Sequence, residues 1–302
     1  MTNPHEPPPP GSTMTRPRTL ERFADERVSR ICDQLATEEP LEIRLVLERN
    51  GVPVKRTAAI TMRTPGHDAE LALGFLFGEA LVDDAAAVAS LESCGPALGS
   101  PPVQNILRVT LAPGVEVPEA SLDRNFVTSS SCGLCGKAAL SALEQRQIHA
   151  VAPGPSLSPE TLLALPDTLR RAQTAFDATG GLHAAALFNR TGALLVVRED
   201  VGRHNALDKV IGWALDRGLL PLSEHVVLVS GRASFELLQK ARRAGLPVLA
   251  AVGAPSSLAV DAAERFGMTL TGFLRDQRFN LYAGAERVAF GEHERTEPYA
   301  RV

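Results

Sequence analysis

The feature that most constrains the fold is a regular alternation of strand-like and helix-like segments in the second half of the chain. The expected order is a helix at 159–176, strands at 182–188 and 193–197, a helix at 205–215, a strand at 225–229, a helix at 235–244, a strand at 248–252, a helix at 258–266 and a strand at 268–274. Asn189-Arg190-Thr191-Gly192 predicts a hairpin turn between the first two strands. This order favours an α/β fold: a mainly parallel sheet with helices on both faces and an antiparallel hairpin at one edge.

The first half of the chain predicts a smaller α+β unit. Residues 41–47 and 54–62 alternate like strands around the hairpin turn Asn50-Gly51, and Asp68 is expected to cap a helix over 70–81. A further strand is expected at 105–111, after a Gly/Pro-rich loop from Cys94 to Pro102. We therefore predict a disordered Pro-rich tail at 1–20, an N-terminal domain at 21–126 and a larger domain at 127–302 that opens with a cysteine loop.

Composition excludes several classes of function. The 302 residues are 44% hydrophobic and carry a net charge of -4, which is typical of an ordinary soluble protein and gives no strongly basic field for nucleic acid. The first 19 residues have no apolar segment that would serve as a secretion signal or membrane anchor. Four cysteines, two of them isolated, make no disulfide scaffold, so we expect a cytoplasmic protein.

Two cysteines lie three positions apart near the start of a predicted helix, in Thr128-Ser129-Ser130-Ser131-Cys132-Gly133-Leu134-Cys135-Gly136-Lys137. The amides and dipole of a helix N-terminus favour an anion, and Lys137 adds a positive charge. A thiolate should therefore form more easily at Cys132 and Cys135 than in free cysteine. Because a thiolate attacks disulfides, persulfides and electrophilic carbon, the loop is predicted to be a sulfur-handling site.

Other interpretations of this cysteine pair stay open. It could be half of a structural zinc site with His183 or His204 as outside ligands, although such sites usually bring a second pair, and Cys32 and Cys94 are isolated. It could form a thioredoxin-type disulfide, although that motif follows a strand and here a Ser-rich loop precedes it. Inert packing is disfavoured because the flanking glycines make a poor core.

Polar and glycine residues follow three successive predicted strands, in the segments 198–205, 230–234 and 253–257. In sheets of this kind the loops after strand carboxyl ends collect ligands, and nearby helix N-termini offer amides to anions. Gly, Ser and Asp are also ordinary turn and cap residues, which explains any one segment alone. It explains less well the accompanying Arg203 and Arg232, which suit phosphate groups.

Five motifs in this order resemble those of the FdhD family, the formate dehydrogenase accessory sulfurtransferases. They are Thr64–Asp68, the cysteine loop, Thr179–His183, Arg198–Lys209 and Ser230–Ser234, and the similarity covers about 21–282. A Cys-x-x-Cys pair alone occurs in many proteins, whereas the five motifs together are specific.

The resemblance implies a sulfurtransferase that accepts a persulfide from a cysteine desulfurase. It would pass the sulfur to the molybdenum of a bis(molybdopterin guanine dinucleotide) cofactor that formate dehydrogenase requires. Cys132 corresponds to the persulfide-bearing cysteine and Cys135 to the second cysteine of the loop. The segment that corresponds to the family's cofactor-binding residues is Phe273, Leu274, Arg275, Asp276, Gln277 and Arg278. The resemblance also implies a homodimer and a three-layer α/β/α, cytidine deaminase-like C-terminal domain.

The comparison with deaminases indicates a different ligand. Their zinc site needs His/Cys-x-Glu at one helix start and Pro-Cys-x-x-Cys at the next, whereas the helix starts here carry Gly202-Arg203-His204-Asn205 and Ser230-Gly231-Arg232. We therefore expect no permanent metal and a pocket for a large polyanion. Its candidate ligands are Arg203, His204, the Gly231 amide, Arg232, Arg275 and Arg278.

Two rival functions remain beside sulfur transfer. A chaperone could bind and deliver the molybdenum cofactor without carrying sulfur covalently, in which case the cysteines would only close a disulfide or hold zinc. A nucleotide deaminase is disfavoured because the metal ligands are missing. His67 and His183 fit capping or packing roles as well as chemistry, whereas the charged neighbours of His204 favour a role at the ligand.

Overall fold

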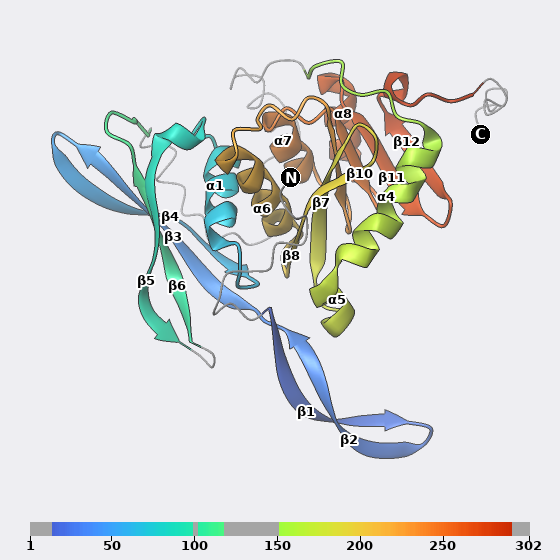
Figure 1. Cartoon of the computed structure of the whole chain (residues 1–302), viewed down its shortest axis with the longest axis horizontal. Helices are drawn as coiled ribbons and strands as arrows, with labels where there is room; N and C mark the ends of the chain where they lie inside the picture. Colours follow the sequence, from blue (N-terminus) through green and yellow to red (C-terminus); the bar gives the residue numbers. More distant parts are fainter. Residues whose placement is uncertain (1–13, 99–101, 118–150, 292–302) are drawn as a thin grey trace.

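The computed structural model describes residues 14–98, 102–117 and 151–291 (Figure 1). Within these residues the strands form a two-stranded hairpin, a four-stranded sheet in the order β4-β3-β6-β5 and a six-stranded sheet in the order β12-β11-β10-β9-β7-β8. The strands are β1 (Thr15–Ala24), β2 (Arg27–Ala36), β3 (Glu39–Arg49), β4 (Val52–Arg63), β5 (Val88–Leu98), β6 (Val103–Leu111), β7 (His183–Asn189), β8 (Leu194–Asp200), β9 (His225–Val229), β10 (Val248–Ala251), β11 (Thr269–Arg275) and β12 (Arg278–Ala283). The helices are α1 (Asp68–Gly78), α4 (Pro159–Ala172), α5 (Thr174–Thr179), α6 (Arg203–Asp216), α7 (Phe235–Arg243) and α8 (Ser257–Phe266).

The six-stranded sheet is mixed. Strands β9, β10 and β11 run parallel, whereas β7 pairs antiparallel with both β8 and β9, and β12 pairs antiparallel with β11. The predicted hairpin at one edge is confirmed. The sheet is less parallel than predicted, because β7 also pairs antiparallel with β9 and because β12 was missed. The turn between β11 and β12 is the two residues Asp276-Gln277, both with positive φ (52° and 57°), and this pair lacks the glycine that usually marks such a turn.

Helices cover both faces of this sheet. Successive side chains of a strand point to opposite faces, and two core clusters separate accordingly. Ala184, Ala186 and Phe188 of β7 pack in one cluster with the apolar side of α4. Ala185 and Leu187 pack in the other with α6, α7 and α8. The α/β class and its helix–sheet–helix layering therefore follow directly from the alternating apolar residues of the central strands.

The four-stranded sheet shares a core with the larger unit. Leu41, Ile43 and Leu45 of β3 belong to the same buried cluster as α1 and α6. Figure 1 shows these two helices side by side between the sheets. The predicted division at residue 126 falls among residues outside the described part of the chain and stays a prediction. Packing between the two units is continuous.

Helices α1 and α6 cross at two glycines. A Cβ added at Gly74 would lie 1.8 Å from the Asp208 carbonyl oxygen, and one added at Gly212 would lie 1.9 Å from the Glu70 carbonyl oxygen. Both obstructions are backbone atoms, which cannot move away as a side chain can. The absence of side chains at these positions therefore allows the helix backbones to touch.

Three further expectations need correction. The tail does not extend to residue 20, because β1 begins at Thr15 and pairs with β2 along its full length; residues 1–13 lie outside the described residues. The first part of the expected loop at 94–102 is strand, because Cys94–Leu98 ends β5; residues 99–101 lie outside the described residues. Gly95 (φ 88°) and Pro96 form a bulge there, which the edge position of β5 tolerates. Asp68 is the first residue of α1, after His67 (φ 57°), and pairs with Arg63 at 2.8 Å.

The predicted helix at 159–176 is two helices. Gln173 has non-helical dihedral angles (φ -83°, ψ 71°) and separates α4 from α5. The Glu199 carboxylate accepts hydrogen bonds from the amides of Ala175 (3.0 Å) and Phe176 (2.7 Å). These two bonds satisfy orphan donors at the start of α5 and fix a new helix axis there. Among the described helices, none is both long enough and apolar enough to cross a bilayer.

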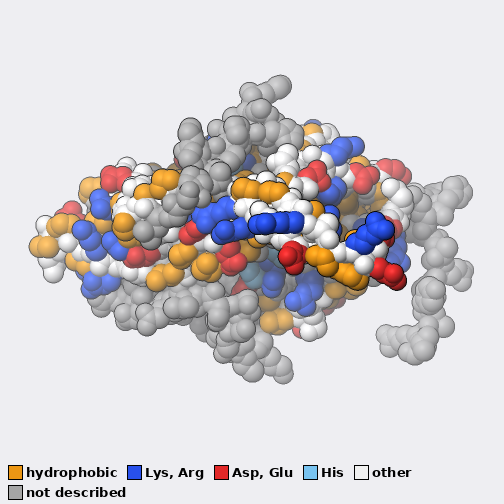
Figure 2. Space-filling model, turned by 90° about the horizontal axis from the view of Figure 1, so that it is seen from below, with side chains coloured by type: hydrophobic (Ala, Val, Ile, Leu, Met, Phe, Trp, Pro, Cys, Tyr) orange, Lys and Arg blue, Asp and Glu red, His pale blue; other side chains and the backbone are white. Residues whose placement is uncertain are grey.

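The β1–β2 hairpin extends away from the rest of the molecule (Figure 1). Seen from below, where this hairpin is nearest the viewer, Lys and Arg side chains gather with hydrophobic ones near the middle of the face (Figure 2). The hairpin contributes five arginines to its two strands: Arg16, Arg18, Arg22, Arg27 and Arg30. Its exposed large hydrophobic residues are Phe23, Val28 and Leu35.

We predict that Gly74→Ala destabilises the protein, although alanine favours a helix over glycine by about 1 kcal/mol. The added methyl would overlap the Asp208 carbonyl and force α1 and α6 apart, which costs about 1–3 kcal/mol or more net of that gain. The matched control is Gly78→Ala in the same helix, where the nearest atom is the Lys240 Nζ at 3.0 Å, the end of a flexible side chain. Urea unfolding of both variants measures the difference. Equal midpoints would contradict the close helix crossing.

Candidate functional site

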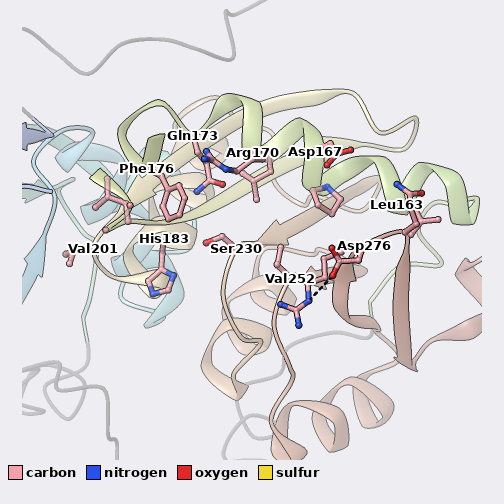
Figure 3. A pocket seen from close by; sticks show the side chains of 17 residues that line it. Leu163, Asp167, Arg170, Gln173, Phe176, His183, Val201, Ser230, Val252 and Asp276 are labelled. Atoms are coloured by element: carbon pink, nitrogen blue, oxygen red, sulfur yellow. Dashed lines mark ion pairs between the residues drawn. The ribbon is translucent and has the colours of Figure 1, made fainter. Parts of the chain in front are cut away.

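A cavity of about 770 Å³ opens at one end of the six-stranded sheet, between the ends of its strands and the helices α4 and α5 (Figure 3). Val201, Ser230, Val252 and Arg275 follow or end β8, β9, β10 and β11 and line it from the side of the sheet. The volume is within the range of small-molecule sites. The cavity therefore lies where the strand-end loops were expected to collect a ligand.

Hydrogen bonds between neighbouring loops hold the floor of this cavity. The Ser230 hydroxyl accepts from the Ala184 amide at 2.8 Å, and the Ser230 amide donates to the Ala184 carbonyl at 2.9 Å. The Gly253 amide donates to the Gly231 carbonyl, and the Phe273 amide donates to the Gly253 carbonyl, each at 3.0 Å. An added Cβ on Gly253 would come within 3.0 Å of the Gly231 oxygen, so glycine allows this close approach.

The predicted cofactor-binding segment has unusual backbone geometry. Phe273, Asp276 and Gln277 all have φ between 51° and 57°, a region that non-glycine residues rarely adopt. Phe273 lies at a register irregularity between Gly272 and Arg275. Such backbone strain costs about 1–3 kcal/mol per residue and clusters at functional sites. Arg275, Asp276 and Gln277 line the cavity, whereas Leu274 is fully buried in the core with α4.

His183 and Arg203 lie side by side where the cavity meets the start of α6. A Cβ added at Gly231 would be 3.4 Å from the His183 Nδ1 and 3.7 Å from the Arg203 Cδ. Burial lowers the pKa of His183, and the positive charge of Arg203 lowers it further, against the opposing charge of Asp200. The imidazole is therefore neutral at pH 7, able to donate or accept a hydrogen bond.

His204 faces away from this pair toward α7. Its Nε2 lies 3.1 Å from the Ser234 hydroxyl and 3.0 Å from a Glu236 carboxylate oxygen. The hydrogen bond from His204 lowers the pKa of Glu236. His204 is thus engaged within the protein, and of the two histidines next to Arg203 it is His183 that lines the cavity.

Much of the Arg198–Lys209 motif serves the fold. Arg198 forms a bidentate pair with Glu70 of α1 at 2.5 and 2.7 Å. Asp200 and Lys209 are fully buried and pair at 2.7 Å. Asp200 also accepts from the Thr64 amide at 3.1 Å, and Lys209 donates to the Thr64 carbonyl at 3.0 Å. The motif therefore joins β8 and α6 to the segment after β4.

The remaining predicted residues divide into three groups. Arg232 and Arg278 are exposed and lie outside the cavity lining, although Arg278 pairs in register with Arg275 across the turn. Cys132 and Cys135 lie outside the described residues. Among the residues that the structure describes, no cluster of His, Cys, Asp or Glu could hold a metal ion. The zinc alternative, with His183 or His204 as an outside ligand, also needs Cys132 and Cys135 and stays a prediction.

Sequence reasoning missed the contribution of α4 and α5. Asp167 and Arg170 of α4, Gln173 between the two helices and Phe176 of α5 line the cavity (Figure 3). The Arg170 guanidinium lies 4.9 Å from the centroid of the Phe176 ring. In a sequence, the polar residues of an amphipathic helix predict a face that is exposed to water. Their spacing does not distinguish such a face from one that borders a cavity.

The architecture and the cavity define a class: an α/β protein with a ligand-sized cavity at the ends of its strands. The model of the FdhD/NarQ family matches residues 36–289, and the chain belongs to this family. It is 53% identical over 279 residues to the sulfur carrier protein FdhD of Streptomyces avermitilis, with 91% of this chain and 96% of that protein covered. It is 51% identical over 282 residues to the sulfur carrier protein FdhD of Mycobacterium tuberculosis, with 91% and 98% covered.

A solved structure shares the fold. The crystal structure of a protein described as a formate dehydrogenase accessory protein from Desulfotalea psychrophila superposes with a TM-score of 0.69 at 23% identity. The match covers 92% of this chain and 100% of that one. The fold is therefore also found in an experimentally determined structure.

We predict that Asp200→Asn costs about 3–5 kcal/mol, because it leaves the Lys209 ammonium buried without its carboxylate. Replacing the partner as well, in the double variant Asp200→Asn, Lys209→Met, should recover part of the loss. The control is Asp177→Asn, which breaks the exposed pair with Arg170 and should cost no more than about 1 kcal/mol. Denaturant unfolding checks all three, and a loss below 1 kcal/mol in the first variant would contradict the structural role of the motif.

Proposed function

We propose that this protein binds a guanine-nucleotide-bearing molybdenum cofactor at the strand ends and delivers sulfur to its molybdenum before insertion into formate dehydrogenase. The observation that carries the proposal is the strand-end cavity. Three residues of the predicted cofactor-binding segment, Arg275, Asp276 and Gln277, line it. Arg203, the first residue of α6, is suited to phosphate oxygens, and the α6 N-terminus adds backbone amides. Arg275 adds a positive charge to the cavity lining.

The sulfur-transfer half of the proposal rests on the cysteine pair and on the relatives named as sulfur carriers. The Cys132 thiolate attacks the terminal sulfur of a cysteine desulfurase persulfide. A new S–S bond forms to Cys132 while the desulfurase S–S bond breaks, and the desulfurase keeps a thiolate. Cys135 is positioned by sequence to attack the Cys132 persulfide, which would release sulfide and leave a disulfide.

The location, oligomeric state, domain type and partners that we propose rest on the same family membership. The working form is a cytoplasmic homodimer, its larger unit is cytidine deaminase-like, and its partners are a cysteine desulfurase and formate dehydrogenase. In place of deaminase zinc ligands, the α6 and α7 starts carry Arg203, His204 and Ser234. This donor set suits an anion better than a divalent metal.

The alternative function is a chaperone that binds the cofactor without carrying sulfur. The cavity alone fits both functions, since nucleotide binding is common to them. Only the chemistry of Cys132 separates the two.

We predict that incubation with a cysteine desulfurase and cysteine adds one sulfur atom to the peptide that contains Cys132, detected by mass spectrometry. Cys132→Ser should bind guanosine diphosphate (GDP) normally yet fail to activate formate dehydrogenase. Arg275→Gln should instead keep the sulfur loading and lose GDP affinity by about tenfold, the effect of one charged hydrogen bond.

The matched control is Cys32→Ser, which removes an exposed free cysteine on β2 and should alter neither property. Activation of formate dehydrogenase by Cys132→Ser would favour the chaperone. Sulfur loading of that variant at the unsubstituted level would refute the assignment of the carrier residue.

A further inference from the structure

The two ends of the strand-end cavity have different chemistry. Toward one end, α4 presents Asp167 near Leu163, with Asp276 of the β11–β12 turn below them (Figure 3). Toward the other end, His183 lies near Val201 and Phe176 (Figure 3). One end, the acidic end, therefore carries two carboxylates, one of them beside Arg275, and the other end adjoins Arg203.

The acidic end suits a group with hydrogen-bond donors. Asp167 and Asp276 are the carboxylates in the cavity lining. Asp276 is 3.7 Å from Arg275, whereas Asp167 forms no hydrogen bond or ion pair with another described residue. An ionised carboxylate only accepts hydrogen bonds. Guanine offers two adjacent donors on one edge, the ring N1–H and the 2-amino group, which a single carboxylate can accept together.

The other end suits an anion. The Arg203 Nε is buried and has no hydrogen-bond partner among the described residues. Gly202, the N-cap of the 14-residue α6, has no side chain to bond the first amides of that helix. His183 makes no side-chain hydrogen bond within the described part of the chain. A guanidinium, helix-start amides that no side chain caps, and a neutral imidazole together match the oxygens of a phosphate group.

Other charged groups near this end are already engaged. His204 bonds Ser234 and Glu236, and Asp200 is buried against Lys209. Arg203 and His183 are thus not engaged by these groups and remain able to meet a ligand at this end.

The two ends are separated by a distance that one nucleotide can span. Asp167 lies five residues before Ala172, the last residue of α4, which is about 7.5 Å along a helix, and the cavity continues past Gln173 to Phe176 and His183. We propose that the nucleotide lies along α4 in one direction, with the guanine edge on Asp167 and the diphosphate at His183 and Arg203. This orientation rests on the proposed function, which places a guanine nucleotide in the cavity.

The base end is tested by comparing GDP with inosine diphosphate (IDP), which lacks the 2-amino group. The unsubstituted protein should prefer GDP by on the order of tenfold, the effect of one hydrogen bond to a charged group. In Asp167→Asn this preference should fall close to unity, while the preference for GDP over guanosine monophosphate (GMP) stays the same. Asp261→Asn, on the exposed side of α8, is the matched control and should change neither ratio.

The phosphate end is tested by comparing GDP with GMP. Arg203→Gln should reduce the GDP/GMP affinity ratio by on the order of tenfold, Arg203→Lys by less, and neither should change the GDP/IDP ratio. Arg190→Gln, in the exposed β7–β8 turn at the opposite end of those strands, is the matched control. Isothermal titration calorimetry gives all the ratios, and circular dichroism shows whether each variant is folded.

The outcomes separate this inference from the proposed function. If the unsubstituted protein does not bind GDP, the nucleotide site is wrong and the orientation falls with it. If GDP binds but Asp167→Asn alters the GDP/GMP ratio and Arg203→Gln alters the GDP/IDP ratio, the nucleotide lies the other way round. If GDP binds but Asp167→Asn leaves the GDP/IDP ratio unchanged and Arg203→Gln leaves the GDP/GMP ratio unchanged, the proposed contacts at the two ends of the cavity are wrong.

Discussion

The buried ion pair of Asp200 and Lys209 is the interaction on which the rest of the structure depends. Both side chains are excluded from water, and such a pair is stable only when its remaining donors and acceptors are satisfied. Thr64 supplies an amide and a carbonyl to the two charges, and Asn205 donates to Asp200 at 3.0 Å. One strand end, one helix start and the segment after β4 are thereby held in a single arrangement.

This arrangement explains why the cavity has a defined shape. Asp200 ends β8 and Glu199 beside it fixes the start of α5, so the same strand end controls both the floor and one wall of the cavity. The glycine crossing of α1 and α6 holds the other side of α6 against the smaller sheet. Arg203, the first residue of α6, is consequently placed by contacts that do not involve any ligand.

The sequence predicted the elements with strong periodicity and missed those whose signal is local. The β7–β8 hairpin and β9 were predicted well because apolar runs bounded by turn residues are unambiguous. Strand β12 was missed because Asp276-Gln277 does not look like a two-residue turn. Leu274 was assigned to ligand binding with its neighbours, yet a strand alternates its side chains, and Leu274 points into the core. Interactions between distant segments, such as Arg198 with Glu70, leave no pattern that one sequence reveals.

The unfavourable backbone geometry around the β11–β12 turn is held in place by contacts with neighbouring strand ends. Three non-glycine residues with positive φ in the Phe273–Gln277 stretch cost stability, and they persist only where the surroundings determine the backbone. The Phe273 amide is held by Gly253, which is held in turn by Gly231. A chain of close backbone contacts therefore runs from the turn to the His183–Arg203 end of the cavity. An arrangement fixed before a ligand arrives loses less conformational freedom on binding, which favours recognition of one extended polyanion in one orientation.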